Sequence, residues 1–250
     1  MNHHTRLKIF LVIILCLVPG MRGIARGSQA DAQSVAYEWV EGEEYYPQEM
    51  PWTYRYTYRY PLLTGEGMLQ ESINDYFRNA LNEMTMLVIP MFAADPIMIG
   101  EGSNEISQCY EVTCNNGIFF SVLMTQVQTV EGKERISLES VVFAASGEYL
   151  GESLTLRGLV RVGPSSQVLG EAVLQDIWED IEIQMRDQAS GWKNDLNSDI
   201  LKAEFYPEVQ FYADALGNAV FYLQPSRFRL DDRVITYTYT PQKLEELLAK

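Results

Sequence analysis

The sequence predicts an α+β fold, in which antiparallel sheets pack against helices in two intimate subdomains. Three observations lead to this fold class. Residues 105–145 have the pattern of three antiparallel strands joined by turn signals. Residues 66–90 and 167–188 change to the helical period, in which apolar side chains recur every three or four positions. Residues 209–239 then return to short strands. The expected divisions are a signal peptide at 1–32, an N-terminal subdomain at 33–146 and a C-terminal subdomain at 147–250.

The N-terminus has the layout of an export signal. Arg6 and Lys8 precede an apolar run of ten residues, 9–18, and Pro19 follows it. Because a helix needs about twenty apolar residues to span a bilayer, we expect a cleaved signal and no stable membrane span. The protein is therefore expected to be secreted, either extracellular or in the cell envelope. A lipid anchor on Cys16 is the alternative, but no small residue stands at the positions before it that a lipoprotein signal requires.

The charge balance is strongly acidic. Small residues suited to signal cleavage lie at both 28–30 and 30–32. Loss of residues 1–32 would remove four basic residues and one acid, which leaves 15 basic and 33 acidic residues and a formal charge of −18. Such a field repels nucleic acid and anionic lipid, and it speeds encounter with a basic protein. The alternative, which is favoured, is that the acidic surface only keeps the protein soluble.

Two strands are expected before the first helix, at residues 35–40 and 52–61. The second alternates strictly, so four tyrosines share one face, and Thr53, Arg55, Thr57 and Arg59 share the other. A row of tyrosines can stack on sugar rings or form a protein-binding hot spot. The candidate binding residues are therefore Tyr54, Tyr56, Tyr58 and Tyr60. The alternative, which is favoured, is that these side chains pack on the core with their hydroxyls reaching its rim.

A single amphipathic helix is predicted from residue 66 to Pro90, which should stop or kink it. This helix is the expected cover for one face of the meander. The run 118–127 is apolar on both of its faces, so we expect a central strand that is covered on both sides.

The strongest turn signal is Asn116-Gly117, because both residues tolerate the positive φ of a type I′ turn. A two-residue loop there would place Cys114 opposite Phe119. Cys109 and Cys114 would then point to opposite faces of one strand, too far apart for a disulfide. We expect two thiols unless that strand is bent or bulged.

The second half combines short strands with helices. Residues 163–166 are expected to cap the helix at 167–188, Thr240 to cap a closing helix, and Leu244 to pack inward from it. The remaining expected elements are a short strand or turn at 154–162, a hairpin of 209–212 with 219–223, and a strand at 234–239.

The chemistry of the chain is limited by its histidines. His3 and His4 are the only two, and both lie in the expected signal, which excludes a Ser-His-Asp triad and the usual catalytic zinc site from the exported part. Residues 195–199 begin like a calcium loop, but Ile200 stands where that loop needs glycine. We expect a polar turn that caps a short helix instead. No cofactor, no metal and no enzymatic activity are predicted.

Short segments spread over most of the chain carry a family resemblance. They are Tyr46-Pro47, 73–77, Tyr110-Glu111-Val112, Ser121-Val122-Leu123, Val142-Phe143, 147–150 and 219–225. Their order resembles a family of exported bacterial domains of uncharacterised general function. That family forms the extracellular part of lysozyme-sensing anti-sigma factors of the RsiV type and the N-terminal module of some secreted polysaccharide deacetylases. The resemblance implies an α+β fold in two parts and no enzymatic activity.

Neither a sigma-binding segment nor a deacetylase domain is recognisable, so we expect a stand-alone exported copy of the module. The resulting hypothesis is a non-catalytic binding module of the bacterial cell envelope, with a basic, lysozyme-like protein or peptidoglycan as ligand. The alternatives are a glycan hydrolase that uses two carboxylates about 5–9 Å apart, and a structural or assembly protein without a small ligand.

Overall fold

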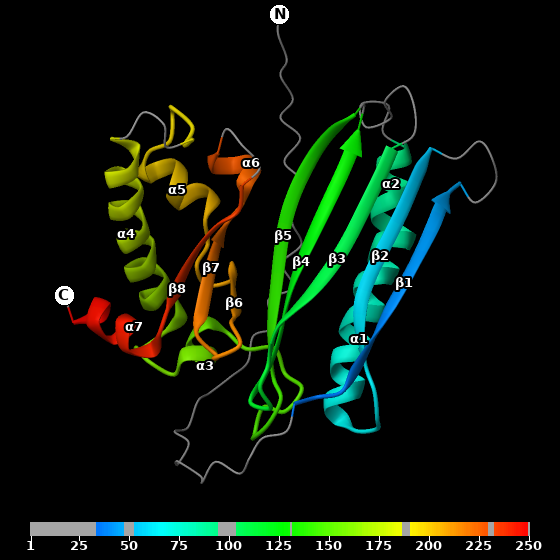
Figure 1. Ribbon diagram of the computed structural model, residues 1–250, viewed down its shortest axis with the longest axis horizontal. Helices are drawn as coiled ribbons and strands as arrows, with labels where there is room; N and C mark the ends of the chain where they lie inside the picture. Colours follow the sequence, from blue (N-terminus) through cyan, green and yellow to red (C-terminus); the bar gives the residue numbers. More distant parts are fainter. Residues whose placement is uncertain are drawn as a thin grey trace, which may run out of the picture. The chain divides into compact units, whose positions relative to one another are not determined.

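The computed structural model describes residues 34–47, 53–94, 104–130, 132–186, 191–229 and 233–249. Ala32–Lys250 form one compact unit. The predicted signal peptide, its cleavage sites and both histidines lie outside the described residues. The α+β fold class is confirmed, because the unit combines a five-stranded sheet, a three-stranded sheet and helices (Figure 1).

The larger sheet has its strands in chain order. They are β1 (Tyr37–Tyr46), β2 (Tyr54–Leu63), β3 (Asn104–Asn115), β4 (Phe119–Val130) and β5 (Lys133–Ala144). Every neighbouring pair is antiparallel except β2 with β3, which are parallel. A parallel pair needs a crossover, which the helices between β2 and β3 supply.

This crossover is α1 (Met68–Glu83), then η1 (Met84–Val88), a π-helical turn, and then α2 (Ile89–Ala94). The prediction was that Pro90 stops or kinks the helix. The helical path continues through Pro90, so it does not stop there, but it is not a regular α-helix just before this proline. Pro90 is the second residue of α2, where a missing N–H is tolerated, and the wider π turn comes directly before it.

The helix face of the sheet holds one part of the core. In this cluster Leu69, Ile73 and Phe77 of α1 are buried against the sheet. The buried sheet residues around them are Leu63, Tyr110, Phe120, Val122, Met124 and Phe143. The amphipathic pattern of residues 66–90 therefore predicted the cover of the meander correctly.

The turn between β3 and β4 is shifted from its predicted position. Asn116 N donates to Phe119 O at 3.3 Å, so Gly117 and Ile118 are the two loop residues. The side chain of Asn116 closes the turn, because its Oδ1 accepts from Ile118 N at 3.0 Å and from Phe119 N at 2.9 Å. Cys114 consequently pairs with Ser121, and the predicted pairing with Phe119 is wrong.

A β-bulge between Val112 and Cys114 also changes which face the cysteines occupy. Cys109 pairs with Thr125 and Cys114 with Ser121, four residues apart on β4. Residues four apart on one strand share a face, so the two cysteines lie on the same face, and the expected opposite placement is wrong. Both thiols are free, with Cys109 exposed and Cys114 buried.

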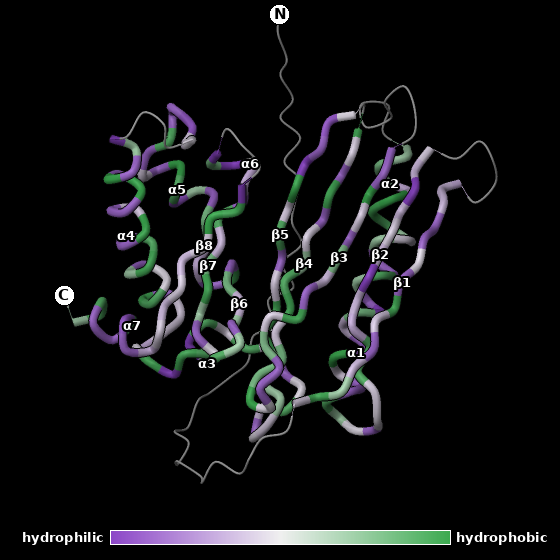
Figure 2. Tube along the Cα trace, in the orientation of Figure 1, coloured by the Kyte–Doolittle hydropathy of each residue, from purple (hydrophilic) through white to green (hydrophobic). Residues whose placement is uncertain are grey.

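The second half of the unit is built from three strands and five helices within the described residues. They are α3 (Leu156–Val160), α4 (Ser166–Met185), α5 (Ser198–Glu204), β6 (Phe211–Ala213), β7 (Ala219–Leu223), α6 (Pro225–Phe228), β8 (Ile235–Tyr239) and α7 (Pro241–Leu248). Hydrophobic and hydrophilic residues alternate along α4 in Figure 2, as its predicted amphipathic pattern requires. Ser165 caps α4 and Thr240 caps α7, both as predicted.

Two expectations for the second half have different outcomes. Residues 156–160 form a helix, so the predicted strand or turn at 154–162 is wrong. Thr155 Oγ1 accepts from Gly158 N at 3.2 Å and caps this helix. Asn197 caps α5 by accepting from Asp199 N and Ile200 N, so the interpretation of 195–199 as a polar, helix-capping turn is confirmed.

Strand β4 is covered on both faces, as predicted. Phe120 and Val122 pack under α1, while Phe119 belongs to the core cluster of the second half. Ser121 lies on the same face as Phe119, and its Oγ accepts from Ala213 N at 3.1 Å. The second half of the chain therefore packs on the face of β4 and β5 that α1 leaves free.

Candidate functional site

Two of the four predicted binding tyrosines lie in the core. Tyr54 is 0% exposed and Tyr56 is 1% exposed, and both pack against Met84, Ile89 and Ile106. These two side chains have no surface left for a ligand, which is the outcome of the alternative interpretation. The hydroxyl of Tyr56 donates to Gln108 Oε1, and Gln108 Nε2 donates to Tyr110 Oη at 3.2 Å.

Tyr58 and Tyr60 are only half-buried. The Tyr60 ring stacks on Phe77 at 5.7 Å and on Tyr58 at 6.1 Å between ring centroids. The row therefore runs from the core to its rim along the face that the helices cover. A binding role for Tyr58 and Tyr60 stays a prediction.

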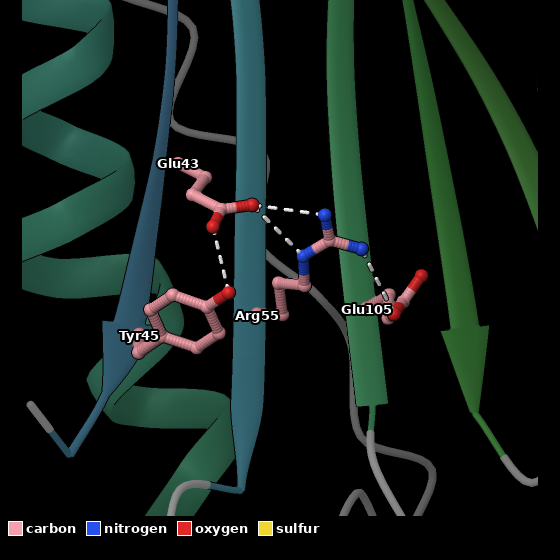
Figure 3. Close-up of polar contacts among 4 residues, drawn as sticks. All are labelled: Glu43, Tyr45, Arg55 and Glu105. Atoms are coloured by element: carbon pink, nitrogen blue, oxygen red, sulfur yellow. Dashed lines mark hydrogen bonds and ion pairs between the residues drawn. The ribbon is translucent and has the colours of Figure 1, made fainter. Parts of the chain in front are cut away.

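The other face of β2 carries a charged network that spans three strands (Figure 3). Glu43 on β1 faces Arg55 on β2, with Arg55 Nη2 and Nε at 2.8 and 3.1 Å from Glu43 Oε2. Arg55 Nη1 lies 3.4 Å from Oε1 of Glu105 on β3. Tyr45 donates its hydroxyl proton to Glu43 Oε1 at 2.7 Å. Both acids and the tyrosine therefore converge on a single arginine.

Four residues further along β2, Arg59 contacts a second group of residues. Its Nε lies 3.1 Å from Glu41 Oε1, and its guanidinium stands 4.0 Å above the ring of Trp39. Trp39 is 36% exposed. An open hollow of about 250 Å³ adjoins this group. It is lined by Glu41, Gly42, Thr57, Tyr58, Arg59, Ser107, Gln108 and the exposed Cys109.

We define the binding face as the side of β1, β2 and β3 that carries Trp39, Glu41, Glu43, Arg55 and Arg59. On this face three acids, Glu41, Glu43 and Glu105, surround two arginines, and both arginines are already paired with these acids. Hydrogen bonds from Tyr45 and then from Arg55 hold the pKa of Glu43 below its ordinary value, so this carboxylate stays charged. The binding face is therefore suited to cations and unsuited to phosphate or nucleic acid.

A second hollow, of about 490 Å³, lies beside the start of α1. Its lining is polar and consists of Gly65, Glu66, Gly67, Gln70, Glu71, Asn74, Asp75 and Arg78. The Asn74 side chain there accepts from Leu63 N and donates to Leu63 O, at 2.9 and 3.0 Å. Asn74 thus fastens the end of β2 to α1, which is a structural role.

Comparisons of the sequence gave no match to protein-family models or to curated proteins. Comparison of the structure with solved structures gave matches. A DUF3298 family protein from Pseudomonas aeruginosa PAO1 aligns with a TM-score of 0.55 at 11% sequence identity, over 86% of this chain and 95% of that chain. A DUF3298 family member from Bacteroides fragilis NCTC 9343 aligns with a TM-score of 0.50 at 12% identity, over 85% and 93%. The fold is of the DUF3298 type.

This DUF3298-type fold brings no group of three potential metal ligands together among its described residues. One carboxyl in those parts has a raised pKa. Glu139 on β5 is exposed as a residue, but partial desolvation of its carboxyl raises the pKa, and the charge of Glu83 on α1 raises it further. None of the described helices combines the length and apolar character needed to cross a membrane.

Sequence reasoning singled out the tyrosine face of β2, where Tyr54 and Tyr56 are buried in the core. It had placed Arg55 and Arg59 together opposite the tyrosines, and the alternation of Glu41 and Glu43 was also visible. Nothing in the sequence showed that β1 and β3 would flank β2, which is what brings Glu43 and Glu105 to Arg55.

Proposed function

We propose that the protein is exported and acts at the bacterial cell envelope as a non-catalytic binding module for a basic, lysozyme-like protein. The observation that carries this proposal is the binding face, where carboxylates outnumber arginines and both arginines are engaged. A cationic partner gains from the remaining negative potential, while an anionic one is repelled. The resemblance to RsiV-type extracellular domains supports the same class of ligand.

Peptidoglycan is the second candidate ligand, and Trp39 is the observation that favours it. Its ring is partly exposed beside Arg59, which lines the open hollow, and exposed tryptophan rings stack on sugars. Arg59 already covers part of that ring at 4.0 Å, which reduces the surface available for stacking. The basic protein is therefore the better supported ligand.

The test measures retention of lysozyme and of purified peptidoglycan by the immobilised exported protein, at about 0.02 M and about 0.15 M salt. We expect lysozyme to be retained at low salt and less at higher salt. The double variant Glu43→Gln/Glu105→Gln should weaken retention about tenfold or more, because it removes two charges from the binding face. The matched control Glu171→Gln/Glu179→Gln removes two charges from α4 and should change the retention of lysozyme about twofold at most. If the protein retains neither lysozyme nor peptidoglycan, the proposal is contradicted.

Export is tested separately by the intact mass of the protein collected outside the cell. We expect a mass that lacks about the first 32 residues, in keeping with the apolar run and its flanking charges. Protein that stays inside the cell with its N-terminus intact would exclude a role at the envelope.

A glycan hydrolase is the alternative from another class, and Glu139 favours it. A carboxyl whose pKa is raised, in part by the charge of another carboxylate such as Glu83, is one feature of a general acid in a glycan hydrolase. Release of soluble fragments from peptidoglycan by the protein, abolished in Glu139→Gln, would establish this activity and replace the non-catalytic proposal.

A further inference from the structure

No described strand pairs with the outer edge of β1. Strand β1 is the last strand of the five-stranded sheet, and it pairs only with β2 among the described residues (Figure 1). None of its ten residues is buried. A free edge of this length presents a row of backbone N–H and C=O groups that can template another strand.

The opposite edge of the same sheet is treated differently. On β5, Ala144 N donates to Glu152 O at 3.0 Å, and Leu154 N donates to Val142 O at 2.7 Å. The Gln224 side chain forms hydrogen bonds with the N–H and the C=O of Leu138. The chain therefore covers much of the β5 edge with its own groups and leaves the β1 edge without such cover within the described residues.

The register of β1 shows which residues offer their backbone to the outside. Thr64 N donates to Ala36 O at 3.0 Å, and the pairing continues without a bulge from Tyr37–Leu63 to Tyr46–Tyr54. Hydrogen-bonded positions alternate in an antiparallel pair, so the even-numbered residues of β1 bond to β2. The outward-facing backbone groups on which the inference rests belong to Tyr37, Trp39, Glu41 and Glu43.

The charges of β1 select what can join this edge. The strand carries four glutamates and no basic residue. Glu41 and Glu43 pair with the arginines of β2, while Glu38 and Glu44 are exposed and form no ion pair with any described residue. A second copy of β1 would bring these acids against one another, which is destabilising. An extended segment with alternating basic residues would place its charges next to them.

We propose that the edge of β1 binds an extended basic segment of a partner protein by strand addition, which extends the five-stranded sheet by one strand. This inference rests on the proposed function, because it names the form in which a basic ligand docks. Main-chain hydrogen bonds to the outward-facing residues give the segment its direction and register. The glutamates of β1 give the preference for lysine and arginine.

Three synthetic peptides of about ten residues, with alternating threonine and lysine, separate strand addition from charge attraction alone. One is unmodified, one is N-methylated at every lysine and one at every threonine. All three have the same charge, but only one set of N–H groups faces β1. We expect one methylated peptide to bind about tenfold or more weakly and the other about as well as the parent. Equal binding of all three, or loss in both methylated peptides, would overturn the proposal.

Two variants of Glu41 test the edge from the side of the protein. Proline is tolerated on an edge strand where its missing N–H faces outward, so Glu41→Pro should keep the β1–β2 pairing and block addition. Glu41→Gln removes the same charge and keeps the N–H. We expect Glu41→Pro to bind the unmodified peptide about tenfold or more weakly than Glu41→Gln, with equal circular dichroism. Equal affinity of the two variants would contradict strand addition.

The two proposals can fail separately. Retention of lysozyme that Glu41→Pro leaves unchanged keeps the proposed function and removes this inference. Binding of one methylated peptide but not the other, with no retention of lysozyme, keeps strand addition and removes the lysozyme-like ligand. A third outcome is that the protein binds no peptide but self-associates in sedimentation experiments, and that Glu41→Pro abolishes this self-association. In that case the occupant of the β1 edge would be a second copy of the chain and not a basic segment.

Discussion

The carboxamide of Gln224 forms hydrogen bonds with both backbone groups of Leu138. Leu138 N donates to Gln224 Oε1 at 2.9 Å, and Gln224 Nε2 donates to Leu138 O at 2.6 Å. Gln224 directly follows β7, and Leu138 lies in the middle of β5. A side-chain amide thus takes the place of a neighbouring strand at this point of the edge, and it joins the second half of the unit to the larger sheet.

Replacement of Gln224 should therefore destabilise the whole unit. Gln224→Ala leaves the N–H and the C=O of Leu138 without their partner, at a cost of about 1–3 kcal/mol in the free energy of unfolding. Gln224→Glu keeps the acceptor but sets a carboxylate against Leu138 O, and should cost at least as much. Urea unfolding measures both. Gln175→Ala, which removes an exposed contact to Glu179 on α4, is the control and should change stability by about 0.5 kcal/mol or less.

Periodicity predicted the elements well, and it failed where the backbone departs from a regular path. Ser165, Thr240 and the apolar stripe of α1 gave correct helices because caps and amphipathic faces are local signals. The bulge after Val112 is set by pairing with β4 and has no local signal, so Cys109 and Cys114 were wrongly expected on opposite faces.

Tyr58 of β2 lies directly across from Gly42 of β1, with its ring over the glycine. A Cβ at Gly42 would overlap the hydroxyl end of this ring, so Gly42→Ala should displace Tyr58 and cost about 1–3 kcal/mol in stability. In the Tyr58→Ala background the same substitution should be neutral or stabilising. The obstructing ring is gone, and glycine weakens a strand more than alanine does. A double-mutant cycle by chemical unfolding measures the coupling. Equal costs in the two backgrounds would show that the ring does not restrict Gly42.

Ser121 is fully buried between the two halves of the unit, and its Oγ accepts from Ala213 N at 3.1 Å and from Thr113 Oγ1 at 3.0 Å. Ser121→Ala should cost about 1–3 kcal/mol, because the N–H of Ala213 loses its acceptor. Thr113→Val removes only the other donor and should cost less. Thermal unfolding of the two variants measures the difference. A larger loss for Thr113→Val would mean that the contact with β6 is not the important one.

The candidate binding face was harder to predict than the fold, for a physical reason. Arg55 and Glu105 are fifty positions apart, and only the parallel pairing of β2 with β3 makes them neighbours. The tyrosines formed the stronger pattern, yet alternation alone does not say which face a helix will cover. The exposed face of β2 became clear only once the crossover helices were placed.

Glu43 should titrate below the ordinary range of a glutamate, because the hydrogen bond from Tyr45 and then those from Arg55 lower its pKa. A carboxyl whose pKa is lower in the folded state contributes stability above its unfolded pKa and loses that contribution as the pH falls through its folded pKa. Tyr45→Phe and Arg55→Met should each move the Glu43 pKa back towards the ordinary value, with the larger change in Tyr45→Phe. Carbon-13 NMR of the side-chain carboxyl measures the titration directly.

The control for this titration is Arg78→Met, which breaks an exposed ion pair with Asp75 on α1 and should leave the Glu43 curve unchanged. If Tyr45→Phe and Arg55→Met also leave the curve where it is, then the network of Figure 3 does not persist in solution. Glu43 would in that case be free to pair directly with a cationic partner, without first giving up its contact with Arg55. The effect of Glu43→Gln/Glu105→Gln on retention would then report the loss of direct contacts between these acids and the partner.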